Sequence, residues 1–245
     1  MIVVDQLQKI YGDTLAVDRL SFSLQSGQIC GLVGKNGAGK TTTMRALAGL
    51  IDATEGRLQV AGCDLHQDPL QVRRQLAYVP DDPPLFNDLS VGQHLDLIGG
   101  IYQVPDYWPR GQELLREFEL EDKQAVAARA LSRGMRQKLA VVCAYLYEPS
   151  VILLDEPLTG LDPPGIRTLL ESIRQRAAAG ATVIISSHLL AMIENVCTHL
   201  LVMQHGRKQF FGPTDQLRGE TDSAASWEQA FFADQHVESF AGGSV

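Results

Sequence analysis

The stretch QICGLVGKNGAGKT, at residues 28–41, decides the fold, because a strand pattern passes into a glycine-rich loop and then into a helix. Its first six residues are largely apolar, as in a buried strand, and a helical pattern follows from Lys40 to Leu50. The loop from Gly34 to Thr41 matches the pattern G-x-x-x-x-G-K-[ST] completely. Its glycines let backbone N–H groups converge on phosphates, and the helix start adds a positive dipole end. The stretch therefore predicts an α/β protein that binds a nucleotide through its phosphates.

Strand and helix patterns alternate on both sides of this loop. Strands are predicted at residues 20–24, 57–60, 76–79, 151–154, 182–186 and 200–203, and a helix at about 165–179. This alternation predicts a core with a largely parallel sheet. After a break at residues 81–84, a helical pattern capped by Ser90 continues to Tyr147, with loops around Pro105 and Pro109. We therefore expect one domain over residues 1–245 with a helical subdomain inserted at about 82–147.

Composition limits the class of protein. The chain of 245 residues carries a net charge of -8, which argues against a dedicated nucleic-acid binder. No run approaches the roughly eighteen apolar residues of a membrane span, and no signal peptide is visible. The four cysteines are scattered, which indicates buried thiols in a reducing, cytoplasmic setting. Residues 214–245 are predicted as a tail with short helices at 214–217 and 226–232 and a frayed end.

An acidic pair stands at the end of the strand predicted at 151–154. Asp155 occupies the place where open α/β sheets put ligand residues, and we expect it to hold Mg²⁺ through water, while Thr41 ligates the ion. Glu156 is predicted to orient and deprotonate the attacking water. The alternative, a pair that only caps a turn, is weak because carboxylates at a buried edge need a cation. His188 follows another strand and is predicted to touch the γ-phosphate, although a lone histidine there is more often structural.

The run LSRGMRQ, at residues 131–137, is a second candidate phosphate grip. Ser132 is predicted to cap a helix that reaches about Tyr147 and to donate to a phosphate beside the N–H of Gly134. This second phosphate-binding segment lies far along the chain from the loop at residues 34–41, which favours contact with the nucleotide bound to another copy. The alternative for Ser132 is a cap alone. Asp162 either faces the seam between two copies or only ends a turn before proline.

The predicted site has a catalytic part and a binding part. Tyr11 is predicted to stack on the adenine ring, with core packing as its alternative. The catalytic candidates are Glu156, His188 and Lys40, and the metal candidates are Thr41, Asp155 and Asp81. The nucleotide-binding candidates are Tyr11, Gly34, Asn36, Gly37, Ala38, Gly39, Lys40, Thr41, Thr42, Ser132 and Gly134.

Taken in order, these motifs resemble the nucleotide-binding subunit of ATP-binding cassette (ABC) transporters, from Tyr11 through Arg207. In that resemblance residues 34–41 are Walker A, 151–156 are Walker B, 131–135 are the signature and His188 is the switch histidine. It implies an N-terminal antiparallel β subdomain, ATP and Mg²⁺ as ligands, and two ATPase subunits that close head to tail. It also implies a separate multi-span membrane subunit that holds the protein at the cytoplasmic face of the membrane.

The chain departs from the usual family pattern at three places. Arg133 and Met135 replace a glycine and the glutamine of the usual Leu-Ser-Gly-Gly-Gln signature, whereas the two expected phosphate donors remain. Asp81 stands where the Q-loop normally has glutamine; it can meet Mg²⁺ through water, but it adds charge near the γ-phosphate. The runs 78–81 and 135–137 resemble the type-2 exporter branch.

Residues 83–86 occupy the place where this family docks a coupling helix of the membrane subunit. We expect Leu85 and Phe86 either to line that groove or to pack inside the helical subdomain. Two rival functions were weighed. A soluble mechanical ATPase acting on DNA or ribosomes is disfavoured by the single cassette, the acidic charge and the lack of heptads. A small kinase or GTPase leaves residues 131–135 without a purpose.

Overall fold

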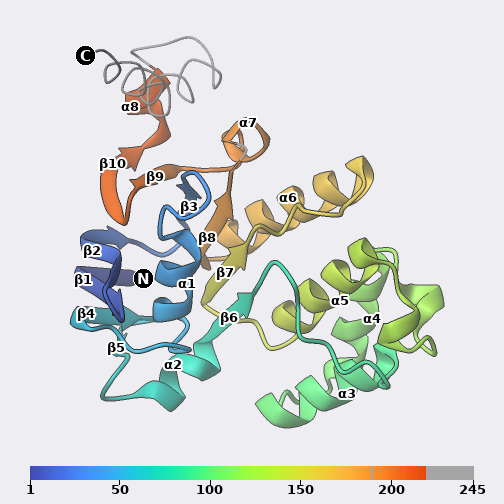
Figure 1. Ribbon diagram of the computed structural model, residues 1–245. Coiled ribbons are helices and arrows are strands. Elements are labelled where there is room, and N and C mark those ends of the chain that lie inside the picture. Colours follow the sequence, from blue (N-terminus) through green and yellow to red (C-terminus); the bar gives the residue numbers. More distant parts are fainter. Residues whose placement is uncertain (189, 219–245) are drawn as a thin grey trace, which may run out of the picture.

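The computed structural model describes residues 1–188 and 190–218, and it places two sheets beside a helical lobe (Figure 1). The four-stranded sheet is antiparallel and runs β2 (Thr14–Leu24), β1 (Ile2–Tyr11), β4 (Glu55–Val60), β5 (Cys63–Asp64). The six-stranded sheet runs β10 (Arg207–Pro213), β9 (His199–Gln204), β3 (Ile29–Val33), β8 (Thr182–Ser187), β7 (Val151–Asp155), β6 (Leu76–Val79). Its pairs are parallel except β10 with β9. The predicted fold class, including the antiparallel N-terminal sheet, is confirmed.

The helices fall into two groups. Around the sheets lie α1 (Lys40–Leu47), α2 (Pro69–Gln75), α6 (Pro163–Ala178), α7 (Leu190–Ile193) and α8 (Thr214–Arg218). The helical lobe holds α3 (Val91–Tyr102), α4 (Tyr107–Glu117) and α5 (Arg133–Tyr145), with short 3₁₀ turns η1 (Glu121–Lys123) and η2 (Ala128–Ala130). This lobe is inserted between β6 and β7, and Figure 1 shows it beside the α/β core.

The core joins the helical lobe to the main sheet. Every residue of β7 is buried, as expected for a central parallel strand covered on both faces. One apolar cluster contains Ile152 from β7 together with Leu95 of α3 and Leu115 of α4. Tyr145, near the end of α5, is fully buried and its ring lies 6.1 Å from that of Phe118. Because this cluster is continuous, the start of α5 is held at a defined position relative to β7.

Several element boundaries differ from the sequence prediction. Pro109 lies in the first turn of α4 and not in a loop. Proline is tolerated there because the backbone N–H groups of a first turn have no acceptor within their own helix, so the N–H that proline lacks breaks no hydrogen bond. The chain from Phe118 to Ser132 forms turns and 3₁₀ segments where a helical pattern was expected. Helix α1 ends at Leu47, before Gly49 with φ +64°.

The predicted start of the helix at Ser90 is confirmed by its cap. The Ser90 hydroxyl accepts a hydrogen bond from the backbone N–H of Gln93, whose side chain accepts in return from the N–H of Ser90. The helix predicted at 214–217 corresponds to α8. The helix predicted at 226–232 and the frayed end lie outside the described residues.

Candidate nucleotide-binding site

The glycine loop between β3 and α1 has the backbone geometry of a phosphate cradle. Gly37 and Gly39 have φ values of +81° and +100°, in the left-handed region that favours glycine. A β-carbon on Gly34 would lie 2.5 Å from the carbonyl oxygen of Met203, so this glycine is packed beneath the loop. A β-carbon on Gly37 would meet nothing within 4 Å. The loop is therefore tightly anchored at its base and open at its tip, where a phosphate would lie.

Lys40 is the buried cation of this loop. It is the first residue of α1 and is only 7% exposed, although an unpaired lysine is costly to bury. Its Nζ donates to the carbonyl oxygen of Gly34 at 2.7 Å and lies 3.6 Å from Oε1 of Glu156. The ammonium group is thus placed between the loop and the end of β7.

A cavity of about 600 Å³ lies over the loop, within the usual range of ligand pockets, roughly 300–1,000 Å³. Most of the predicted site residues line it, namely Tyr11, Asn36, Gly37, Ala38, Gly39, Lys40, Thr41, Thr42, Asp81, Asp155 and Glu156. Gly34 is buried beneath it, and Ser132, Gly134 and His188 are not among its lining residues. The structure therefore brings eleven of the predicted residues together.

Two parts of the cavity wall were not predicted from the sequence. Residues 14–16, at the start of β2, and the turn of His205 and Gly206 between β9 and β10 also line it. They meet across the backbone, because the N–H of Asp18 donates to the carbonyl of Gly206 and the N–H of Gly206 donates to that of Ala38. These segments carry no phosphate-binding motif, so no sequence signal marks them.

Asp155 is the most buried carboxylate of the site, at 2% exposure. The Ser186 hydroxyl donates to it at 2.5 Å, and the Tyr78 hydroxyl donates at 3.3 Å. Burial, aided by the Asp155 carboxylate, raises the pKa of Tyr78 to about 12, so its hydroxyl stays protonated and able to donate. Each strand beside β7 thus supplies one hydrogen-bond donor to Asp155: Tyr78 comes from β6 and Ser186 from β8. Ser186 is the residue that pairs with Asp155 in the sheet.

Glu156 lies between an ammonium group and an imidazole. Its backbone has φ +47°, an uncommon conformation for a non-glycine residue, and its N–H donates to the Ser186 hydroxyl at 2.9 Å. One carboxylate oxygen lies 3.6 Å from Nζ of Lys40, and the other lies 2.8 Å from Nδ1 of His188. His188 is therefore placed by contact with Glu156, and its predicted contact with the γ-phosphate stays a prediction.

Tyr11 stands at the far wall of the cavity and is 45% exposed, so the core-packing alternative is wrong. The ammonium group of Lys9 lies 4.9 Å from the centre of its ring. One face of the ring is thus occupied by a cation. Stacking of the adenine ring on Tyr11 stays a prediction.

The signature segment forms the start of α5. The Ser132 hydroxyl accepts from the N–H of Met135 at 3.2 Å, which confirms the predicted cap. A β-carbon on Gly134 would lie 2.6 Å from the carbonyl oxygen of Gly160, so this glycine also has a packing reason within the chain. Asp162 caps α6 by accepting from the N–H of Gly165. Its turn role is confirmed, and a role at a seam between copies stays a prediction.

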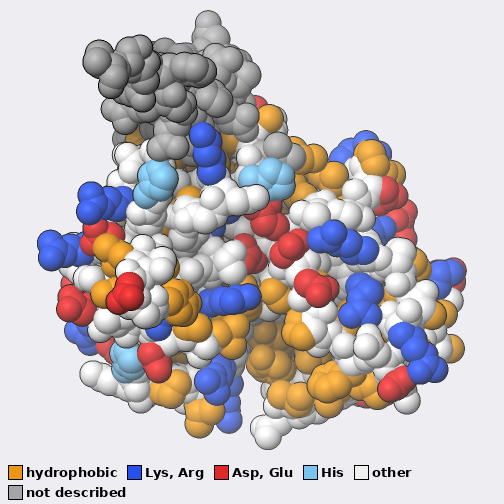
Figure 2. Space-filling view, in the orientation of Figure 1, with side chains coloured by type: hydrophobic (Ala, Val, Ile, Leu, Met, Phe, Trp, Pro, Cys, Tyr) orange, Lys and Arg blue, Asp and Glu red, His pale blue; other side chains and the backbone are white. Residues whose placement is uncertain are grey.

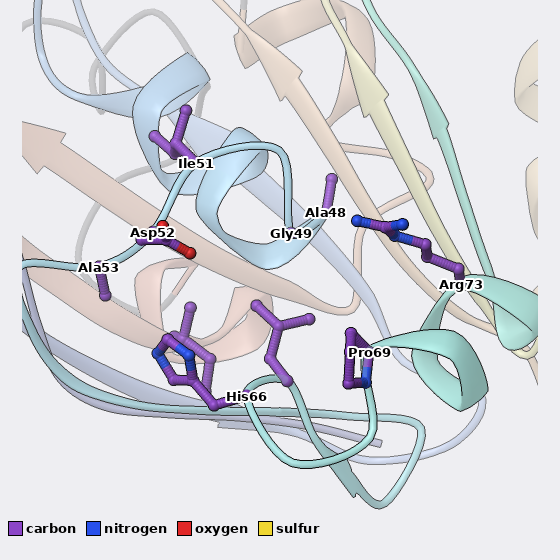
Figure 3. Close-up of a pocket in the computed structure, with 10 residues that line it drawn as sticks. Ala48, Gly49, Ile51, Asp52, Ala53, His66, Pro69 and Arg73 are labelled. Carbon is purple, nitrogen blue, oxygen red and sulfur yellow. The ribbon is translucent and has the colours of Figure 1, made fainter.

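A second cavity, between the end of α1, the β4–β5 hairpin and α2, is too small to compete (Figure 3). Its volume is about 180 Å³, below the roughly 300 Å³ at which ligand pockets usually begin. Figure 3 shows the Arg73 side chain extending toward Ala48, at the C-terminal end of α1. A cation near the C-terminal end of a helix is favourable to the helix dipole.

A glycine loop of this geometry between a parallel strand and a helix places the chain among the P-loop nucleotide hydrolases. Comparison with known protein families narrows this class. The family described as "ABC transporter" matches residues 17–159, which is more than half of the chain, and the chain belongs to this family.

Individual relatives agree with this assignment. The chain is 35% identical over 220 residues to the "ABC-type transporter ATP-binding protein EcsA" of Bacillus subtilis, covering 89% of both chains. It is 37% identical to the "Nod factor export ATP-binding protein I" of Ralstonia nicotianae, over 87% of this chain and 67% of that one. A solved structure, "Structure of ATP binding subunit of ABC transporter", superposes with a TM-score of 0.85 at 35% identity, covering 90% of this chain and 92% of that chain. The predicted ATP-binding and ATP-hydrolysing activity is thereby confirmed.

Proposed function

We propose that this chain is the motor subunit of an exporter, in which ATP binding closes two ATPase subunits and drives a separate membrane subunit. The observation that carries the catalytic part is the position of Glu156 beside Lys40 and His188, at the rim of the phosphate loop. Export is supported by the relative whose name is "Nod factor export ATP-binding protein I". No helix among residues 1–188 and 190–218 is long and apolar enough to cross a membrane.

In this proposal the residues of the pocket divide the chemistry. Lys40 and the backbone N–H groups of the loop bind the β- and γ-phosphates of ATP. Glu156 holds the attacking water and accepts its proton, while His188 fixes the direction of the Glu156 carboxylate through their 2.8 Å contact. Tyr11 supports the adenine ring. When the phosphates arrive, they replace the carbonyl and carboxylate oxygens that now surround the Lys40 ammonium group.

The donor set suits Mg²⁺. Asp155 is a buried carboxylate whose two hydrogen-bond donors here are neutral hydroxyls, and Thr41 lines the same cavity with an exposed side chain. We propose that these two residues hold the ion, whereas Asp81, which lines the same cavity, is paired with Arg133. Bound Mg²⁺ would neutralise charge that develops on the phosphates.

The second ATPase subunit would be required by the signature segment. Ser132 and Gly134 do not line the chain's own cavity, so within one copy they would have no phosphate to bind. We propose that they close on the γ-phosphate of the ATP bound to the other subunit. The partner is a second copy of this chain or a related subunit.

The membrane subunit is proposed to dock in the groove between the α/β core and the helical lobe. Figure 2 shows hydrophobic side chains gathered along this groove, on its lower side. The two residues of the predicted docking segment, Leu85 and Phe86, differ in their exposure. Leu85 packs against the core cluster, whereas Phe86 is 60% exposed. Phe86 is therefore the residue of the pair that is available to a partner, and the protein would lie at the cytoplasmic face of the membrane.

The test is a pull-down of tagged Glu156→Gln protein from detergent-solubilised membranes with ATP, followed by identification of what is recovered. A multi-span membrane protein supports the proposal, and its recovery should fall in Glu156→Gln/Phe86→Asp. Leu85→Asp is unsuitable here because it is expected to lose stability. Recovery only from the soluble fraction with DNA or ribosomes attached would overturn the exporter function in favour of a mechanical ATPase.

A further inference from the structure

Two residues that depart from the usual family pattern, Asp81 and Arg133, contact each other. The guanidinium Nη2 of Arg133 lies 3.2 Å from Oδ1 of Asp81, although the two residues are 52 positions apart. Asp81 also lines the nucleotide cavity, whereas Arg133 is the first residue of α5. The ion pair therefore connects the cavity of this chain to its own signature segment.

The position of Arg133 is defined by packing as well as by charge. A β-carbon on Gly160 would lie 3.1–3.4 Å from three atoms of the Arg133 side chain, so the stem of that side chain crosses the Gly160 backbone. Gly160 belongs to the loop that follows Glu156. A side chain resting on this loop has less freedom to move than an arginine that extends into water, so its charged end is held near Asp81.

The charge of Asp81 creates a problem that the ion pair solves. Because β6 lies beside β7, Asp81 enters the cavity on the side of Asp155 and Glu156. A third carboxylate on that side repels the phosphates of ATP unless a cation offsets it. Arg133 is placed to do so. Its side chain is 63% exposed and that of Asp81 is 51% exposed, so the pair contributes little to folding stability.

We propose that Asp81 and Arg133 act as one neutral unit, in which Arg133 is a positioning residue that lets a carboxylate border the γ-phosphate site without weakening ATP binding. The proposal concerns the chain's own cavity and needs neither the membrane subunit nor transport. Its failure would leave the proposed export function untouched.

The experiment is a double-mutant cycle on equilibrium binding of MgATP and MgADP to the purified chain. Arg133→Ala exposes the Asp81 charge and should weaken MgATP binding by roughly five- to tenfold, with a smaller effect on MgADP, which lacks the γ-phosphate. Asp81→Asn should tighten MgATP binding by about two- to threefold, because it leaves the arginine uncompensated. The double variant should return to within about twofold of the original affinity.

Two further measurements separate charge from packing. Arg133→Lys keeps the cation and should retain most of the affinity. The weakening in Arg133→Ala should shrink as the salt concentration rises, because exposed charges are screened. The matched control is Arg129→Ala, which breaks the ion pair between Arg129 and Asp88. Neither residue lines the cavity, so MgATP affinity should stay unchanged.

One result would overturn the proposal directly. If Asp81→Asn/Arg133→Ala binds MgATP as weakly as Arg133→Ala alone, the arginine acts through packing and not through the charge of Asp81. Equal weakening of MgATP and MgADP would contradict its placement at the γ-phosphate.

Discussion

The phosphate loop and the start of α5 are both proposed phosphate-binding ends of helices, but the nucleotide cavity lies over the first and is not lined by the second. The loop at Gly34–Thr41 lies under about 600 Å³ of open space, bordered by Lys40, Asp155 and Glu156. Ser132 and Gly134 do not line this cavity; Ser132 caps α5, and Gly134 packs against the carbonyl of Gly160. This separation is what the proposed sharing of both halves between two subunits requires.

The largest predicted effect comes from removing Glu156, the proposed general base beside the phosphate loop. Glu156→Gln should reduce ATP turnover by about 10²–10⁴-fold, the usual contribution of a positioned general base. MgATP binding should persist, since the amide keeps the shape of the side chain. Steady-state ATPase assays and nucleotide binding on the same preparation check both statements. Hydrolysis at the original rate would remove Glu156 from the mechanism.

A mixing experiment tests whether the two halves belong to different copies. Lys40→Ala should inactivate the loop half and Ser132→Arg the α5 half, so each variant alone should lose most of its ATPase activity. Random pairing of equal amounts yields one intact composite site in half of the dimers, which predicts recovery of about a quarter of the original activity.

ATPase activity measured before and after mixing decides the question. No recovery, with both variants folded and able to associate, would contradict the exchange of halves. Recovery requires that each site takes its loop from one subunit and its α5 start from the other.

A smaller effect distinguishes the cap from the phosphate contact at Ser132. Ser132→Ala removes an N-cap and should lower the free energy of unfolding by about 1 kcal/mol. Ser90→Ala removes the corresponding cap of α3 and is the matched control, with a similar loss in denaturant unfolding. Only Ser132→Ala should also weaken ATP-induced dimerisation, measured by light scattering. Equal dimerisation in both variants would leave Ser132 with the cap alone.

The smallest predicted effect concerns the hydroxyl that donates to Asp155. Tyr78→Phe should cost about 1 kcal/mol of stability, the usual value of one hydrogen bond. Because the folded-state pKa is raised from its ordinary value of 10.0 to about 12, this contribution is complete below pH 10 and is lost as the pH rises toward 12. The stability difference between the original chain and Tyr78→Phe should therefore shrink over that interval, as measured by unfolding at a series of pH values. A constant difference up to pH 12 would contradict the raised pKa.

The candidate catalytic residues could be located from the sequence because their signals are local. A glycine loop between a strand and a helix, and an acidic pair at the end of an apolar strand, depend on neighbours within about ten residues of the chain. Parallel strands then bring their C-terminal ends to one edge of the sheet, which is why Lys40, Asp155 and Glu156 meet as expected. The same local rules account for the caps at Ser90 and Ser132.

Contacts between distant segments required the folded chain. The cavity walls at residues 14–16 and 205–206, the difference between partly buried Leu85 and exposed Phe86, and the pair of Asp81 with Arg133 follow from how the lobe and the sheets pack. Sequence spacing sets which side chains share a strand or a helix, but it does not set the distance between residues joined only through a common core. The motifs therefore identify the ATPase from the sequence, while the charge balance inside its pocket depends on long-range packing.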